Sequence, residues 1–367
     1  MALFYKPGKP ESNIQIMKKP ELVILANEVK SDHELWVRAC EKRSDEISHR
    51  IVNLTTSNWY EDIFRQPVDY LLAKPGGLTS RFKKLYDERL SILVREKHLR
   101  SFPSLDEVLI HENKVFQSYW LKAGDLPHPA TYVFYHLEEA EDFADKAVLP
   151  LVTKLNIGSS GKGVGILRTK PELEQYIREI FAYGRRSRSG PNLSRGGYLR
   201  RAATVLSKRG MLQEKLSKYS AIRDEVQKGY VLLQEYIPHE YEWRVVRIGD
   251  SFFAHKKMRV GDKASGSLKK EYGCPPAELL DFVRTITDRF GFMSMSADLF
   301  EPESGRYLIN EMQCIFGQSD PHQMMIDGKP GRYLYRNGEW VFEEGNFNTN
   351  QCFDLRVDYV INMLKQG

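Results

Sequence analysis

The chain has 367 residues, of which 41% are hydrophobic and 28% charged, a composition typical of a globular protein with two or three domains. Its net charge of +5 is mild, and aromatic residues do not alternate with the basic ones, so nucleic acid is not a favoured partner. No run approaches the ~18–20 uncharged apolar residues of a membrane-spanning helix, and the first residues lack the apolar core of a signal peptide. The four widely spaced cysteines argue against a zinc site or a disulfide framework. We therefore expect a soluble, cytoplasmic protein.

Short apolar runs alternate with polar, periodic segments at the start of the chain. We expect strands at 21–27, 50–54 and 68–73, and helices at 31–43 and 78–99. Alternating strands and helices are typical of α/β layers. Residues 1–112 are therefore predicted to form a small N-terminal α/β domain.

The rest of the chain is richer in strand candidates. We expect strands at 149–155, 164–168, 231–236, 243–248, 251–257, 297–301 and 306–311, and helices at 114–122, 171–182 and 276–290. Asn337-Gly338 predicts a hairpin turn. We divide this part into two lobes, residues 113–235 and 236–367.

A basic segment at about 183–228 interrupts the first lobe. It is rich in arginine, lysine and glycine and contains few acidic residues. We interpret it as a partly flexible insertion. Its charge favours an anionic substrate, such as an acidic peptide or a uronic-acid saccharide, although a solvated surface loop has the same composition.

A glycine-rich segment follows the predicted strand that ends in Lys154. Residues 150–165 read Pro-Leu-Val-Thr-Lys-Leu-Asn-Ile-Gly-Ser-Ser-Gly-Lys-Gly-Val-Gly. Glycines let backbone N–H groups approach phosphate oxygens closely, and Lys154 adds a positive charge. The spacing matches neither a Walker loop nor a Rossmann fingerprint. The segment indicates a phosphate-binding loop, and taken alone it is also compatible with a plain hairpin turn.

Two later segments place polar residues on strands. An apolar strand ends at Gln234-Glu235, where the backbone can meet the edge of an adenine. Residues 240–249 and 254–259 suggest an antiparallel pair with charged residues on one face, from which Arg244 and Arg259 could clamp a phosphoryl group or a carboxylate. Alone, these patterns are also compatible with an ordinary strand and a solvated charged face.

The sharpest signal is a predicted hairpin that carries acidic residues. Asp298 lies on the first strand, while Glu311 and Gln313 lie two residues apart on the second and so share one face. Two carboxylates and an amide oxygen suit Mg²⁺ that also holds phosphate oxygens. The hairpin therefore predicts a magnesium site, the alternative being a polar hairpin face.

The order of these motifs resembles that of the ATP-grasp superfamily over about residues 113–317. The resemblance implies an α+β fold in which two lobes clamp ATP, preceded by the small α/β domain. It implies that the glycine loop closes over the phosphates and that Mg²⁺ is bound, with two ions expected and Mn²⁺ as a possible substitute. The nucleotide-binding residues that it implies are Lys114, Lys154, Gly158, Ser159, Ser160, Gly161, Gly163, Val164, Gln234, Glu235, Tyr236, Ile237 and Glu242.

The same resemblance assigns the remaining site residues. Asp298, Glu311 and Gln313 correspond to the metal ligands, and Arg259, with Arg244 and Lys257, to the cations of the catalytic site. Stretches 241–246 and 258–259 look more like the glutamate-adding ligases than like the carboxylases of this superfamily. One departure is that the usual Glu-x-Asn and Pro-Gly loop are here Glu311-x-Gln313 and residues 314–317 (Cys-Ile-Phe-Gly).

The implied reaction joins a carboxylate to an amine. The acid attacks the γ-phosphate of ATP, and the amine then attacks the acyl-phosphate, with Arg259 steadying the oxyanion. Both substrates would be small molecules, and a homodimer is possible. Two alternatives stay open: a kinase of this fold that phosphorylates a hydroxyl, and an inactive nucleotide-binding homologue.

Overall fold

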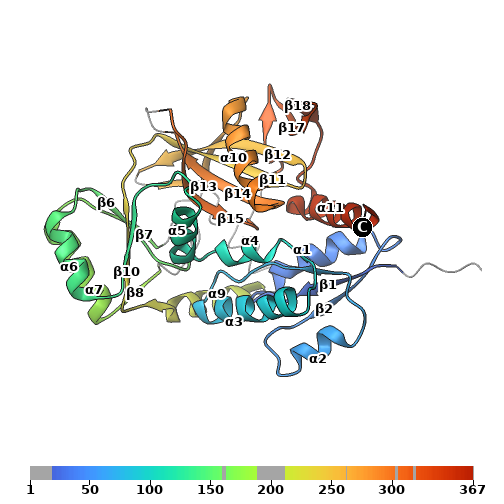
Figure 1. The fold of residues 1–367 in the computed structure, drawn as a ribbon, viewed down its shortest axis with the longest axis horizontal. Helices are drawn as coiled ribbons and strands as arrows, with labels where there is room; N and C mark the ends of the chain where they lie inside the picture. Colours follow the sequence, from blue (N-terminus) through green and yellow to red (C-terminus); the bar gives the residue numbers. More distant parts are fainter. Residues whose placement is uncertain are drawn as a thin grey trace, which may run out of the picture.

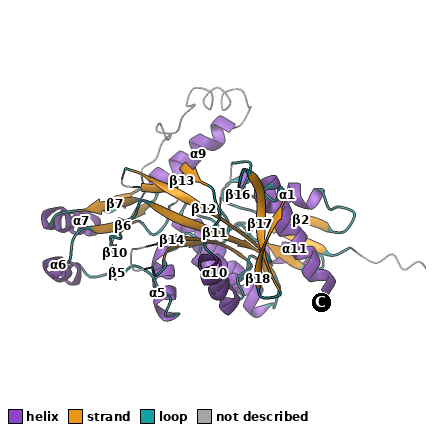
Figure 2. Ribbon diagram, turned by 90° about the horizontal axis from the view of Figure 1, so that it is seen from above, coloured by secondary structure: helices purple, strands orange, loops and turns teal. Residues whose placement is uncertain are grey.

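The computed structural model describes residues 19–158, 163–187, 211–261, 263–301, 305–316 and 320–366. Within these ranges, no helix is long and apolar enough to cross a membrane. Figures 1 and 2 both place helices α6 (Leu137–Lys146) and α7 (Lys170–Ala182) at one end of the molecule and α1 (Lys30–Glu41) and α11 (Phe353–Gln366) toward the other.

The N-terminal sheet is parallel, with the order β2-β1-β3-β4. Its strands are β1 (Glu21–Leu25), β2 (Ser48–Val52), β3 (Tyr70–Leu72) and β4 (Ser101–Phe102), and its other helices are α2 (Trp59–Phe64), α3 (Ser80–Ser91) and α4 (Leu105–Ile110). Strand β1 is buried along its whole length, as its unbroken apolar run predicts. The helix expected at 78–99 is shorter than predicted, because regular α-helix ends at Ser91 and a π-helical turn, Ile92–Glu96, follows.

A second, small antiparallel sheet has the order β5-β10-β6-β7. It consists of β5 (Thr131–Phe134), β6 (Leu151–Lys154), β7 (Val164–Leu167) and β10 (Val231–Glu235). Helices α6 and α7 cover it, and helix α5 (Lys114–Ala123) precedes it. Helix α7 begins at a capping box, since Thr169 accepts the backbone N–H of Glu172 while the Glu172 carboxylate accepts that of Thr169.

The basic segment is partly described. Strand β8 (Arg185–Arg186) pairs with β9 (Val226–Gln227), and helix α9 (Met211–Asp224) leads into β9. Residues 188–210, which hold many of the basic residues, lie outside the described residues. The described part forms regular strand and helix, and the expectation of a partly flexible insertion stays a prediction because it falls largely on residues outside the described ranges.

The large sheet follows, with the order β15-β14-β11-β12-β17-β16 and with β13 and β18 added beside β12 and β17. Its strands are β11 (Tyr241–Ile248), β12 (Ser251–Val260), β13 (Lys263–Glu271), β14 (Ser294–Phe300), β15 (Leu308–Gln313), β16 (Met325–Ile326), β17 (Lys329–Arg336) and β18 (Glu339–Glu344). Helix α10 (Ala277–Phe290) and a 3-10 turn (Thr349–Cys352) complete this part. The hairpin predicted at Asn337-Gly338 is confirmed, since Arg336 pairs with Glu339 and both turn residues have positive φ.

Two hydrophobic clusters underlie these three sheets. One runs continuously from the N-terminal sheet into the large sheet. The other lies beneath the small sheet and is formed with α6 and α7. Ion pairs between the residues that end α1 and helix α11, such as Lys42–Asp354 at 2.6 Å, join segments far apart in the chain. The small sheet is therefore the part of the fold with a core of its own.

Candidate active site

A cavity lies between the small sheet and the large sheet. Its walls come from β6 and β7 on one side, from β11, β12, β14 and β15 on the other, and from the link that follows β10. Of the predicted nucleotide-binding residues, its lining includes Lys114, Lys154, Gly158, Val164, Gln234, Glu235, Tyr236, Ile237 and Glu242. Lys257 and Glu311 line it too. The structure thus gathers residues from distant parts of the sequence in one cavity.

The link after β10 forms the apolar end of the cavity. The backbone N–H of Glu235 is already used by the carbonyl of Ala130, at 2.8 Å. Tyr236 and Ile237 follow the last strand residue, and the Ile237 carbonyl is bonded to Nδ1 of His239. The N–H groups of both residues and the carbonyl of Tyr236 are therefore the backbone groups that remain for an adenine edge. Val152, Ile166 and Phe300 supply apolar side chains around this end. Such a slot suits a flat heterocyclic base.

Lys114 lies at the beginning of α5. Its Nζ donates to the carbonyl of Gly158 at 2.9 Å and lies 3.5–3.6 Å from the carboxylates of Glu311 and Glu112. Burial acts to lower the pKa of Lys114, but the two carboxylates outweigh it and raise that pKa. The lysine therefore stays charged beside Gly158, at the start of the glycine loop.

Lys154, at the end of β6, is held differently. Its Nζ donates to Oδ1 of Asn310 at 2.7 Å, a neutral amide oxygen. Burial lowers the pKa of Lys154 to about 8, and the nearby carboxylates of Glu311 and Glu242 offset only part of this effect. The cavity therefore contains a buried cation without a bonded anion among the described residues, as a phosphate-binding group requires.

Four charged side chains form a network on the large sheet. Arg244 makes a bidentate pair with Asp298, at 2.7 and 2.8 Å. Lys257 bridges Asp298 at 2.7 Å and Glu242 at 2.5 Å. Although burial raises the pKa of Asp298, Arg244 and Lys257 outweigh it and hold that pKa well below its usual range. Asp298 is therefore an ionised, fully compensated anion.

The predicted hairpin is confirmed, and it contains a β-bulge. Asp298 pairs with Glu311, but the next pair is Leu299 with Ile309, so Asn310 is an extra residue. In a regular strand, Asn310 and Glu311 would point to opposite faces. Because of the bulge, both line the cavity, and Asn310 connects Lys154 to Glu242. Strand alternation could not have predicted this role for Asn310.

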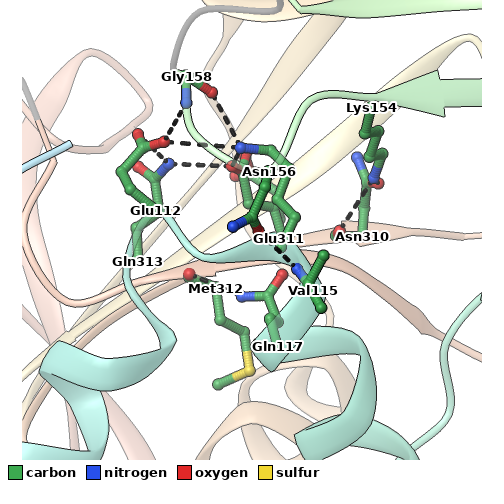
Figure 3. Close-up of polar contacts among 12 residues, drawn as sticks. Glu112, Val115, Gln117, Lys154, Asn156, Gly158, Asn310, Glu311, Met312 and Gln313 are labelled. Atoms are coloured by element: carbon green, nitrogen blue, oxygen red, sulfur yellow. Dashed lines mark hydrogen bonds and ion pairs between the residues drawn. The ribbon is translucent and has the colours of Figure 1, made fainter. Parts of the chain in front are cut away.

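Oxygen donors for a magnesium ion are present at this hairpin. Gln313 donates to the carboxylates of Glu112 and Glu311, both at 3.1 Å, which confirms that Glu311 and Gln313 share a face (Figure 3). In the described part of the chain, no three histidine, cysteine or acidic side chains form a metal centre by themselves. This donor set fits an ion that takes further ligands from phosphate oxygens and water. Glu311 and Gln313 would hold such an ion, with Asp298 directly across the strand pair.

Some predicted residues lie elsewhere. The guanidinium of Arg259 donates to the backbone carbonyls of Gly261 and His239, and Arg259 is not among the described residues that line the cavity. Arg244 is not among the described lining residues either, but it contacts Asp298 of the acidic hairpin directly. Gly163 lies at the turn before β7, where its carbonyl accepts from Leu155. Ser159, Ser160 and Gly161 lie outside the described residues.

Several residues at the site were not predicted. Glu112 is buried beside Lys114 and accepts the backbone N–H of Gly158. Asn156 receives the backbone N–H of Val115, which fixes the first turn of α5 against the glycine loop (Figure 3). His239 lines the cavity next to Glu242. Each lies within three residues of a predicted site residue, and this proximity was the one feature of the sequence that could have indicated a place at the site.

Comparison with known proteins gives matches by structure. No family model and no curated protein sequence matches the chain. A D-alanine–D-alanine ligase from Bacillus anthracis, complexed with ATP, superimposes with a TM-score of 0.52 at 12% identity and covers 95% of this chain and 99% of its own. A D-cycloserine synthetase gives a TM-score of 0.52 at 12% identity over 93% of this chain and 99% of its own.

An ADP complex of N5-carboxyaminoimidazole ribonucleotide synthetase also matches, with a TM-score of 0.51 at 13% identity, over 82% of this chain and 71% of its own. At these identities the similarity identifies the fold. It agrees with the order of the sequence motifs and with the cavity between the two antiparallel sheets. The chain therefore adopts the ATP-grasp fold.

Proposed function

We propose that this protein is an ATP- and magnesium-dependent ligase that joins a carboxylate to an amine through an acyl-phosphate. The observation that carries the proposal is the convergence of Lys114, Lys154 and Glu311 on one cavity with an apolar slot at its other end. The slot suits the base of a nucleotide, and the lysines suit its phosphates. The division at residues 112/113 and 235/236 is part of the same proposal.

The residues present suit phosphoryl transfer followed by acyl transfer. A carboxylate oxygen of the acid attacks the γ-phosphorus, the bond to the β-γ bridging oxygen breaks, and ADP leaves. The amine nitrogen then attacks the acyl carbon, phosphate leaves, and the nitrogen loses a proton. Lys154 and Lys114 would offset the negative charge of the phosphates, and Mg²⁺ would supply further charge neutralisation when bound.

Arg244 is better placed than Arg259 to stabilise charge in these steps. Asp298 fixes its guanidinium through Nε and Nη2, which leaves the N–H groups of Nη1 to donate to a developing negative charge without reorganisation. The use of two ions and replacement by Mn²⁺ belong to this proposal. The proteins of similar fold include a D-alanine–D-alanine ligase and a D-cycloserine synthetase. Both are consistent with the proposed formation of a bond between two substrates.

The direct test is release of ADP and phosphate over a panel of amino acids combined with small acids, uronic acids and peptides. A ligase releases both only when an acid and an amine are present together. A kinase would instead leave the phosphoryl group on a product hydroxyl. If no combination raises ADP release above the background, the proposed reaction is wrong.

The variant Glu311→Gln tests the site itself. We expect turnover to fall about a hundredfold or more, because a carboxylate beside the phosphates and the metal ion is lost. Glu311 is half-buried and its contacts to Lys114 and Gln313 are long, so the melting temperature should change little. The matched control is Glu88→Gln, an exposed glutamate on α3, which should behave like the wild type. Full activity in the Glu311 variant would contradict the assignment.

A further inference from the structure

The carboxyl ends of β1 and β3 lie side by side in the N-terminal sheet. The order β2-β1-β3-β4 places β2 on one side of β1 and β3 on the other, so the chain reverses its direction of progress across the sheet between β1 and β3. In open parallel sheets, ligands bind outside the carboxyl ends of the strands at such a switch point. The described residues that line the nucleotide cavity all come from later parts of the chain. This edge of the sheet is therefore a separate place for a ligand.

Lys74 follows β3 at this edge. Its backbone is fixed, since its N–H donates to the hydroxyl of Tyr86 at 3.1 Å and its carbonyl accepts from the side chain of Asn27, which follows β1, at 2.6 Å. Its Nζ pairs with Asp32 at 2.9 Å. Burial nevertheless lowers the pKa of Lys74, and nearby cations on α9 and α11 add to this effect. A single paired carboxylate therefore does not balance the positive charge at this edge.

The cation on α11 is Arg356, which is completely buried. Its Nε donates to the hydroxyl of Ser294 at 3.1 Å and its Nη1 to the carbonyl of Gln351 at 3.3 Å, and both acceptors are neutral. Nη2 is buried and has no hydrogen-bond partner among the described residues. A guanidinium remains charged in proteins, so burying one without a bonded anion is costly. The unsatisfied Nη2 indicates that an anionic ligand completes this position.

The segment after the acidic hairpin leads from the magnesium donors to Arg356. Phe316 follows Gln313 by three residues, and the guanidinium of Arg356 lies 5.2 Å from the centroid of its ring. The chain therefore places this cation a few residues beyond the donors that we assign to Mg²⁺.

The loop after Lys74 reaches the same end of the cavity. A Cβ atom on Gly77 would lie only 2.6 Å from Cγ of Glu112, so the loop packs directly against that side chain. Glu112 in turn lies beside Lys114 and accepts the backbone N–H of Gly158. Lys74 and Arg356, which we call the cation pair, are thus connected to the phosphate-binding end from two directions.

Helix α9 of the basic segment adds a third cation. Lys218 is exposed on this helix and is the α9 cation that acts to lower the pKa of Lys74. The carboxylate of Glu225, next to the end of α9, accepts the backbone N–H of Ser80 at 3.0 Å, which attaches this segment beside the loop that follows β3. The described part of the basic segment therefore increases the positive charge around the cation pair.

We propose that Lys74 and Arg356 bind an oxyanion of the acid substrate, a carboxylate or a phosphate that does not take part in the reaction. The inference rests on the proposed ligase function and narrows its acid to one that carries a second negative group. Ammonium and guanidinium groups are the side chains that bind carboxylates and phosphates most strongly. We assign the oxyanion to the acid because the acid is the substrate that meets the γ-phosphate, and Glu112 joins the two places.

The experiment is calorimetric titration of the protein with acids, in the presence of Mg²⁺ and a non-hydrolysable ATP analogue. Succinate, glutarate and adipate are each compared with the monocarboxylate of the same carbon number, and a third arm uses ω-phosphono acids of matching length. At least one acid with two negative groups should bind about tenfold or more tightly than its matched monocarboxylate. The tighter of the dicarboxylate and phosphono arms identifies which oxyanion the site takes.

Two variants locate the effect. Lys74→Met and Arg356→Met should each remove the preference for the second negative group and leave the affinity for the monocarboxylates unchanged. Because Arg356 has no bonded carboxylate, its replacement by an apolar side chain of similar length should leave the midpoint of urea denaturation unchanged or raise it. If Arg356→Met folds poorly, Lys74→Met still tests the site.

A second buried arginine provides the matched control. Arg247 lies 5.1 Å from the ring centroid of Phe252, but it is paired with the carboxylate of Asp288 at 2.5 Å. Arg247→Met should therefore lower the midpoint of urea denaturation and keep the preference for the second negative group.

Three results separate the possible failures. A wild type that binds the ATP analogue but binds the matched acids alike would overturn the inference alone. Retention of the preference in Lys74→Met or in a folded Arg356→Met would also overturn it. A wild type that binds no ATP analogue would instead refute the proposed function.

Discussion

The two walls of the cavity each contribute a buried lysine, and the two lysines are stabilised in opposite ways. Lys257, on the large sheet, is bonded to the carboxylates of Asp298 and Glu242. These carboxylates raise the pKa of Lys257 even though burial acts to lower it. Lys154, on the small sheet, is bonded to the amide oxygen of Asn310, and burial lowers its pKa to about 8.

This difference separates structural charge from charge available to a ligand. The charge of Lys257 is balanced inside the protein, so its role is to hold Glu242 and Asp298 in place. The charge of Lys154 is balanced only in part, so an incoming phosphate would find a cation whose desolvation has already taken place during folding. The comparison predicts that variants of the two walls will have different effects on stability and on nucleotide affinity.

The largest effect is expected for Asp298→Asn. This change removes the anion that compensates both Arg244 and Lys257 in a buried setting. Leaving buried charges without their partner costs about 3–5 kcal/mol. The free energy of unfolding, measured by urea denaturation, should fall by this amount, together with turnover. An unchanged denaturation midpoint would show that the network does not stabilise the fold.

A smaller and more selective contrast is expected between Lys257→Met and Lys154→Met. The first should lower the free energy of unfolding by about 3 kcal/mol, the lower end of the range for a broken buried pair, because Asp298 keeps Arg244. The second should leave stability within about 1 kcal/mol of the wild type, because a poorly compensated buried cation is removed.

Nucleotide affinity should show the opposite order, with the larger loss in Lys154→Met and the smaller one in Lys257→Met. Lys154→Met should weaken ATP binding about tenfold or more, as loss of a charged hydrogen-bond donor to phosphate does. Urea denaturation and calorimetric titration on both variants provide the measurements. If the two variants lose the same free energy of unfolding, the distinction between the two walls is wrong.

The smallest expected effect is the pH dependence of ATP binding. With a pKa of about 8, Lys154 is mostly charged at pH 7 and mostly neutral at pH 9. Phosphates favour the charged form, so affinity should fall as pH rises through 8, by at most about tenfold between these two values. Binding near pH 8 should also take up protons, which calorimetry in buffers of different ionisation enthalpy detects. Lys154→Met should lose this dependence, and a wild type with constant affinity would contradict the lowered pKa.

Secondary structure was predictable where a single pattern was strong. The buried run of β1 and the Asn337-Gly338 hairpin follow from the sequence, as does the Asp298–Glu311 pair. Helices α4, α6 and α11 were not predicted, although α4 begins with a capping box formed by Ser104 and Glu107. Short helices such as α4 depend on the surfaces against which they pack, whereas α11 has 14 residues and was missed despite its length.

The amino-acid sequence by itself determined the order of the nucleotide-binding motifs, because glycines, lysines and acidic pairs have chemistry that their spacing reveals. Tertiary structure alone decided which charges balance one another. The pairing of Arg244 with Asp298 and the bulge that turns Asn310 toward Lys154 both depend on strand register and burial. Those quantities arise from packing between segments far apart in the chain, and no local pattern encodes them.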